Sequence, residues 1–204
     1  MKRIRFWKII LVVVILFLLI SCSVRNNPDL TGVEGCLPPC WSGIKPGETR
    51  TDLAIQILTD LETKGEGKLQ VLETNIEWKN KTGQSYYLYT ENDKIKLVKI
   101  YIDGVSLQDV VSQFGNPSSF AVTNIRDDGN FNVVLFYPDK GVAFVADSVN
   151  NLGFKTAPNM PISLVFFTKP GNLPEMINKL YGEKYSTTVL EAIQKWKGFG
   201  DLKP

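Results

Sequence analysis

Strand-like segments joined by short turns constrain the fold of this chain more than any other feature. The first group covers residues 69–78, 85–90 and 96–102, and the second covers residues 119–124, 132–137, 141–146 and 162–167. Turn-forming residues separate neighbouring segments, as at Asn92-Asp93 and Asp128-Gly129-Asn130. Because short turns join antiparallel neighbours, whereas parallel strands need long crossovers, we expect antiparallel sheet.

Three expected helix starts share a capping pattern, in which a hydrogen-bond acceptor precedes an acidic residue by three positions. The pairs are Thr49 with Asp52, Ser106 with Asp109, and Asn172 with Glu175. Gly115 and Gly182 stand where the second and third helices should end, and a last helix is expected from Thr188. Helices combined with antiparallel strands predict an α+β fold. We expect the helices on one face of the sheet, with the other face left for solvent or a partner.

The first 21 residues have the composition of a secretory signal peptide. Four basic residues and no acidic residue precede position 9, an apolar stretch covers residues 9–20, and Ser21 and Cys22 follow. This ending resembles a bacterial lipobox, which implies cleavage before Cys22 and lipid, including palmitate, attached there. The alternative is an uncleaved membrane helix, although a stretch of about 12 residues rises only about 18 Å against a hydrocarbon core of roughly 30 Å. We therefore expect a lipid-anchored protein on the extracytoplasmic face of a cell membrane.

Removal of the signal peptide changes the charge balance of the chain. Without its four basic residues, the 23 Lys and Arg fall to 19 against 21 Asp and Glu, a net charge of −2. No basic excess remains to suggest nucleic acid as a partner. The chain has no histidine, which excludes Ser-His-Asp and Cys-His catalysis and histidine-based zinc sites. No cofactor is expected.

The segment after Cys22 is expected to be a flexible tether followed by a disulfide. Residues 22–35 are polar and rich in turn-forming residues. Outside the cytoplasm, the pair Cys36 and Cys40 predicts a disulfide, with free thiols as the alternative. An extended Leu-Pro-Pro linker would separate the α-carbons by roughly 12 Å, whereas a disulfide needs less than about 7 Å. The linker must therefore turn, through a helical conformation at Pro39 or a cis peptide bond before a proline.

Two short segments resemble a known family. Residues 43–49, Gly-Ile-Lys-Pro-Gly-Glu-Thr, and residues 114–117, Phe-Gly-Asn-Pro, resemble a helix start and a helix end in BamE-type (SmpA/OmlA) envelope lipoproteins. The related β-lactamase-inhibitor-like modules repeat a helix-plus-strands unit in tandem. The resemblance implies two such units, at residues 36–103 and 104–204, the second with additional C-terminal helices. Because the motifs describe backbone turns, the resemblance implies no catalytic residue.

Aromatic residues are the candidates for contact with a partner. Strand alternation places Tyr87 and Tyr89 on one face of the sheet and Tyr86 on the other. Such a face either stacks on a ligand or forms ordinary cross-strand pairs. Trp41 directly follows Cys40 and is either an exposed anchor for a partner or a core residue packed near the disulfide.

The charged groups have simpler interpretations. Lys94, Lys96 and Lys99 are expected on a solvated strand face. The Asp and Asn residues around Gly129 lack the spacing and the bidentate Glu of a calcium loop, so we interpret them as a hairpin turn and expect no metal site.

The sequence therefore predicts a non-catalytic binding or scaffold module for an envelope partner. One alternative is a lipid-anchored receptor for a small solute, which requires a hollow of roughly 300 Å³ or more. The other is a carboxylate-dependent hydrolase of cell-wall glycans, which requires two carboxyl groups roughly 5–10 Å apart in a cleft.

Overall fold

A computed structural model describes residues 36–123, 130–148 and 155–202. The signal peptide, Cys22 and the tether expected at residues 22–35 lie outside the described residues, as do residues 127–129 of the expected hairpin turn. The strands are β1 (Gly67–Val71), β2 (Asn75–Asn80), β3 (Ser85–Glu91), β4 (Lys94–Tyr101), β5 (Ser119–Thr123), β6 (Asn132–Tyr137), β7 (Val142–Asp147), β8 (Lys155–Thr156), β9 (Ile162–Thr168), β10 (Ile193–Gln194) and β11 (Gly200–Asp201). The helices are α2 (Thr51–Thr63), α3 (Leu107–Phe114), α4 (Leu173–Tyr181) and α5 (Glu183–Glu191), with a 3₁₀ turn at Pro138–Lys140.

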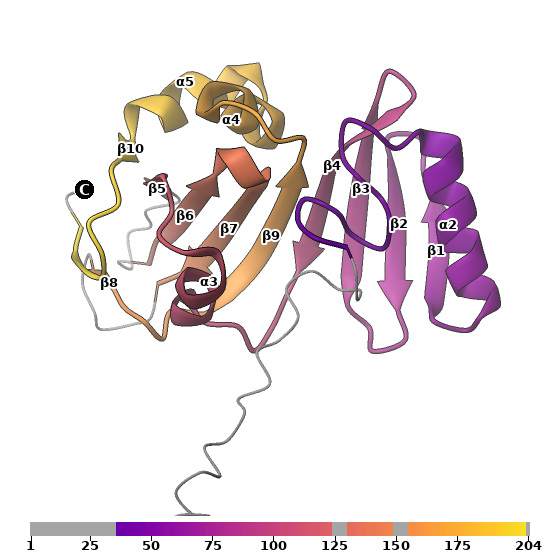
Figure 1. Cartoon of the computed structure of the whole chain (residues 1–204), viewed down its shortest axis with the longest axis horizontal. Coiled ribbons are helices and arrows are strands. Elements are labelled where there is room, and N and C mark those ends of the chain that lie inside the picture. The colour runs from indigo at the N-terminus through magenta and orange to yellow at the C-terminus, as the bar shows by residue number, and fades with distance from the viewer. Residues whose placement is uncertain (1–35, 124–129, 149–154, 203–204) are drawn as a thin grey trace, which may run out of the picture.

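One antiparallel sheet of nine strands organises the fold, in the order β1-β2-β3-β4-β9-β7-β6-β5-β10 (Figure 1). β8 and β11 form a separate antiparallel pair. A large antiparallel sheet with helices packed against it is an α+β fold, which confirms the predicted fold class. No helix within the described residues is long and apolar enough to cross a membrane.

Two groups of strands meet at the middle of this sheet. α2 precedes β1 to β4, and α3 precedes β5, β6, β7 and β9. The last strands of the two groups pair with each other, from Leu97 opposite Thr168 to Tyr101 opposite Leu164. The division expected between residues 103 and 104 falls in the loop between β4 and α3. That the two groups are repeats of one unit stays a prediction.

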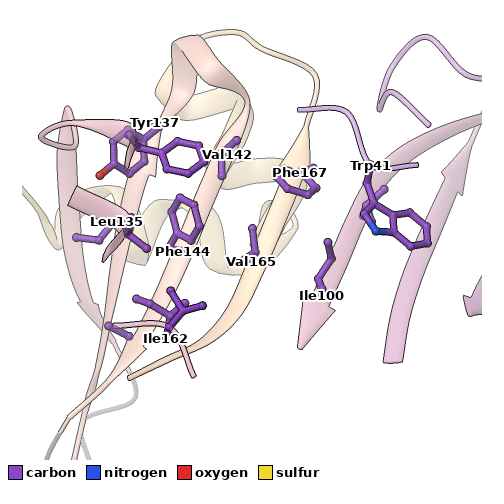
Figure 2. Close-up of a cluster of buried hydrophobic side chains, with 14 of the residues drawn as sticks. Trp41, Ile100, Leu135, Tyr137, Val142, Phe144, Ile162, Val165 and Phe167 are labelled. Carbon is purple, nitrogen blue, oxygen red and sulfur yellow. The ribbon is translucent and has the colours of Figure 1, made fainter. Parts of the chain in front are cut away.

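The larger hydrophobic core lies on the face of the sheet that α2 and α3 cover. Leu58 of α2 and Val110 of α3 are fully buried there. Figure 2 shows the side chains of this core along neighbouring strands, with Tyr137, Phe144 and Phe167 among them. Burial of such large apolar side chains stabilises the fold by about 1.5–3 kcal/mol each, so this face holds the two strand groups together.

The helices do not all pack on one face of the sheet, and that part of the expectation was wrong. α4 and α5 place Met176, Ile177 and Val189 in a second core on the opposite face, over the second strand group. The reason is the composition of the central strands: five consecutive residues are buried in β6 and five in β7. A strand that is apolar on both faces needs cover on both faces.

Two of the three capping patterns form as the sequence predicts. The Ser106 hydroxyl accepts a hydrogen bond from the Asp109 amide, and the Asp109 carboxylate accepts one from the Ser106 amide. The Asn172 side chain accepts a hydrogen bond from the Glu175 amide at 2.9 Å. At α2, however, the N-cap is Arg50, because the hydroxyl of Thr49 already accepts the Lys45 amide in the preceding turn at 2.8 Å.

Two other elements differ from their expected bounds. The expected strand at residues 69–78 is a hairpin of β1 and β2, closed by a hydrogen bond from the Leu72 amide to the Asn75 carbonyl at 2.9 Å. The helix expected from Thr188 was also wrong, since α5 ends at Glu191 and the chain continues as β10. β10 pairs with β5, which would otherwise be an unprotected edge strand.

Candidate functional site

The candidate site is one side of β1 to β4, which the described helices leave uncovered except where α4 contacts β4. On the face of the sheet opposite the larger core, α4 and α5 cover the second strand group. The same face of β1 to β4 carries mainly polar and tyrosine side chains. In β2, for example, buried residues alternate with half-buried or exposed ones, as in a sheet with one solvated face. We call this surface the open face, and it consists of Lys68, Gln70, Glu77, Lys79, Tyr87, Tyr89, Lys99 and Tyr101.

Strand register aligns four of these side chains in one row across the sheet. Gln70 lies opposite Glu77, Glu77 opposite Tyr87, and Tyr87 opposite Lys99. The hydrogen bond to the Glu77 carboxylate is the main cause that raises the pKa of Tyr87 above its usual value. Side chains directly opposite on one face contact each other, so the row is a continuous surface in which uncharged and charged side chains alternate.

A pair of tyrosines and a lysine form the centre of the open face. The rings of Tyr87 and Tyr101 meet edge to face with their centroids 5.9 Å apart, and the Lys99 ammonium lies 4.7 Å from the centroid of the Tyr101 ring. Tyr101 is nevertheless 44% exposed. Large aromatic side chains that remain exposed on a sheet are the residue type that anchors protein–protein contacts.

The open face carries more positive than negative charge. Lys68 lies directly opposite Lys79, and both are exposed. Like charges in such a pair repel each other and weaken the strand pairing. With Lys99, three lysines stand on the open face with one carboxylate, that of Glu77. Residues 22–204 carry a net charge of −2, so this local excess is a property of the face and not of residues 22–204 taken together.

A shallow hollow of about 410 Å³ borders the open face where β3 and β4 meet the C-terminal end of α4. We call it the lysine groove. Its apolar lining comes from Tyr89, Leu97, Phe166 and Leu180, and its ammonium groups come from Lys96, Lys99 and Lys179.

Two of the three ammonium groups of the lysine groove form no ion pair with a carboxylate among the described residues. Lys96 forms an ion pair with Glu91 at 2.7 Å, whereas neither Lys99 nor Lys179 forms an ion pair with another residue that the structure describes.

The register between β3 and β4 shifts by one residue at Lys96, since Tyr89 faces Leu97 and Thr90 faces Ile95. This bulge turns Ile95 toward the core while Leu97 lines the groove.

Trp41 is a core residue and not an exposed anchor for a partner. Its side chain is 3% exposed and stacks on Tyr86, with ring centroids 4.5 Å apart. Figure 2 shows Trp41 near Ile100, on the side of the sheet that holds the larger core. Cys40 and Ile44 are buried beside it, because the short loop that carries these residues folds back onto the sheet.

The segment before Trp41 is closed by a disulfide between Cys36 and Cys40. Their α-carbons are 5.3 Å apart, and the peptide bond between Pro38 and Pro39 is cis. This is one of the two turns that the Leu-Pro-Pro linker allowed. The pair therefore fixes the start of the folded region next to the buried Trp41.

The structure brings together some of the predicted site residues and separates others. Tyr87 and Tyr89 share the open face as expected, and Trp41 lies on the opposite side of the sheet. Sequence reasoning missed Lys99 as a site residue, although strand alternation aligns it with Tyr101 two residues later. It also missed Lys179, for which no local signal exists, because only the packing of α4 against β4 and β9 brings Lys179 to the groove.

A second hollow, of about 350 Å³, lies near the C-terminal end of the described chain. Phe120, Gln194, Lys197 and Asp201 are among its lining residues. No group of three or more Cys, Asp and Glu residues that could hold a metal ion occurs in the part of the chain that the structure describes. Comparison with known proteins adds no family: no protein-family model, no curated protein and no solved structure matches this chain.

Proposed function

We propose that this protein is a membrane-anchored extracytoplasmic lipoprotein that acts as a non-catalytic binding or scaffold module. In this proposal, lipid on Cys22 attaches the chain to the membrane, residues 22–35 tether the folded region, and the open face holds an envelope protein. The anchor follows from the sequence pattern before Cys22. The binding role follows from the folded region.

One observation supports the binding role. On one face of the sheet, helices cover one half and leave the other half open. α4 and α5 bury the apolar half, whereas the open half presents Tyr87, Tyr101 and Lys99 in contact with one another. Tyr87 is half-buried and Tyr101 is 44% exposed, and aromatic side chains of this kind are enriched at protein–protein interfaces.

The two alternatives have unequal support. A receptor for a small solute is supported by the two hollows of about 350 and 410 Å³, which fall within the usual range for ligand sites. A glycan hydrolase needs two carboxyl groups in one cleft. Among the residues that the structure describes, Asp201 is the one carboxylate residue that lines the first of these hollows, and none lines the second, so no observation favours this alternative.

Site-specific photo-crosslinking in intact cells tests the proposal. A photoreactive amino acid at Tyr101, which is 44% exposed, is expected to give one discrete crosslinked protein. The matched control is Leu53 on α2, which is 48% exposed but lies away from the open face, and it is expected to give none. A Cys22→Ser variant is expected to lose palmitate labelling, because the thiol that would carry the lipid is absent.

Two results would contradict the proposal. Equal crosslinking from Tyr101 and Leu53 would mean that the open face is not a specific surface. Retention of palmitate by the Cys22→Ser variant would mean that the anchor is not at Cys22.

A further inference from the structure

We propose that the lysine groove binds an acidic segment of a partner protein, with an apolar side chain of that segment on the groove floor. This inference rests on the proposed function, since it names the chemistry of the partner that the open face would hold. It goes further in two respects, because it assigns a second contact area beside the tyrosines and a charge to its occupant.

Charge complementarity is the first argument. The described residues that line the groove include three lysines and no carboxylate, and among them Lys99 and Lys179 form no ion pair with any described residue. Lys68 and Lys79 add positive charge on the adjoining open face. A surface of this kind attracts negative groups and repels positive ones, which sets partner choice more strongly than it sets affinity.

The form of the groove is the second argument. Leu97 is buried, but the other apolar lining residues, Tyr89, Phe166 and Leu180, are only half-buried. A small solute in such an open hollow would keep much of its surface in water, whereas small-molecule sites usually bury 70–90% of the ligand. A segment of a larger partner fits better, because the rest of the partner would cover the hollow from above.

The position of the groove is the third argument. Lys99 lines the groove and also lies over the Tyr101 ring, so the groove and the tyrosine pair form one continuous surface. Lys179 stands on the opposite side, on the last turn of α4. A partner segment between Lys99 and Lys179 would therefore contact both the sheet and the helix, and would place an apolar side chain over Leu97.

Binding of two designed peptides to the full chain, purified in detergent micelles, tests the inference. The acidic probe has three Asp-Leu-Ser-Asp repeats, the neutral probe has three Asn-Leu-Ser-Asn repeats, and fluorescence anisotropy measures their affinities. We expect the neutral probe to bind about tenfold more weakly. We also expect added salt to weaken only the acidic probe, because exposed charge pairs are screened.

Variants of the groove lysines locate the binding. The double variant Lys99→Glu/Lys179→Glu is expected to bind the acidic probe about tenfold more weakly, since it loses two exposed charge pairs and adds two repulsions. Lys64→Glu, at the exposed C-terminal end of α2 on the other face of the sheet, makes the same charge change away from the groove and should bind as the wild type does. The milder Lys99→Gln/Lys179→Gln variant, expected to lose about threefold, gives the same information if charge reversal impairs folding.

Each other result overturns the inference. Equal affinity for the two probes, or an equal loss in Lys64→Glu, would mean that the groove does not select negative charge. Complete displacement of the acidic probe by acetate or inorganic phosphate, at an ionic strength where sodium chloride leaves the probe bound, would mean that the groove takes a small anion and not a peptide. If crosslinking from Tyr101 succeeds while the groove variants keep full affinity, the inference fails and the proposed function stands. If neither probe binds and crosslinking from Tyr101 also fails, the inference and the binding-module proposal fail together.

Discussion

Replacement of Trp41 by alanine separates stability from partner binding. Trp41 is 3% exposed and its ring stacks on Tyr86 at 4.5 Å. Truncation of a buried Trp to Ala costs about 3–5 kcal/mol, since the lost transfer free energy adds to the cost of the cavity. Domains of this size are stable by about 5–15 kcal/mol. We therefore expect Trp41→Ala to remove a large fraction of the free energy of unfolding while leaving the open face in place.

Urea unfolding followed by far-ultraviolet circular dichroism measures this loss. With a slope of about 2 kcal/mol per molar urea, a loss of about 4 kcal/mol lowers the unfolding midpoint by about 2 M. Leu37→Ala is the matched control, because Leu37 lies four residues away and is 83% exposed. A surface change of this kind should alter stability by less than about 0.5 kcal/mol. Trp41→Phe keeps an aromatic ring against Tyr86 and should lose less than Trp41→Ala.

The opposite pattern would refute the assignment of Trp41 to the core. If Trp41→Ala unfolds within about 1 kcal/mol of the wild type, its ring is not part of the packed interior. If the same variant also loses the crosslink from Tyr101 under conditions where it remains folded, Trp41 is an anchor for the partner after all.

Two further predictions concern stability. The double variant Cys36→Ser/Cys40→Ser should lose about 2 kcal/mol of its free energy of unfolding, since the disulfide closes a very short loop. Reduction of the wild-type disulfide should lower the urea midpoint by the same amount. A larger loss in the variant than in the reduced wild type would show that the serines themselves destabilise the fold. Burial raises the pKa of Tyr181 to about 12, from about 10 in the unfolded chain. The native state then holds this proton more tightly than the unfolded chain does. The contribution of Tyr181 to the free energy of unfolding is therefore complete below about pH 10 and is lost as pH rises toward about 12. Tyr181→Phe should show a weaker fall in stability over this range, and an identical fall would exclude Tyr181 as its cause.

Features that depend on neighbouring residues could be predicted from the sequence. The capping box of Ser106 and Asp109 forms because the two side chains are three residues apart, which any helix start brings together. Gly115 and Gly182 end their helices with φ angles of 79° and 74°, which glycine adopts without strain. The opposite faces of Tyr86 and Tyr87 follow from strand alternation alone.

Features that depend on tertiary packing could not be predicted in the same way. Thr49 has the right spacing to cap α2, but its hydroxyl is used by the Lys45 amide of the preceding turn. β10 forms where a helix was expected, because β5 offers an edge for pairing. Lys179 reaches the groove only because α4 packs over β4 and β9, and no pattern within α4 contains that information.

The boundary between the covered and the open half of the sheet explains where a partner would bind. On this side Lys99 of β4 lies directly opposite Phe166 of β9, so the surface changes from charged to apolar between two paired strands. α4 covers the apolar side of that boundary with Ile177 and Leu180. Extension of this helical cover onto the open face would bury Lys99 and Lys79 without partners, at a cost that the added apolar contacts would not offset. A partner that brings carboxylates avoids this cost, and therefore the boundary between β4 and β9 favours an acidic segment over a further apolar layer.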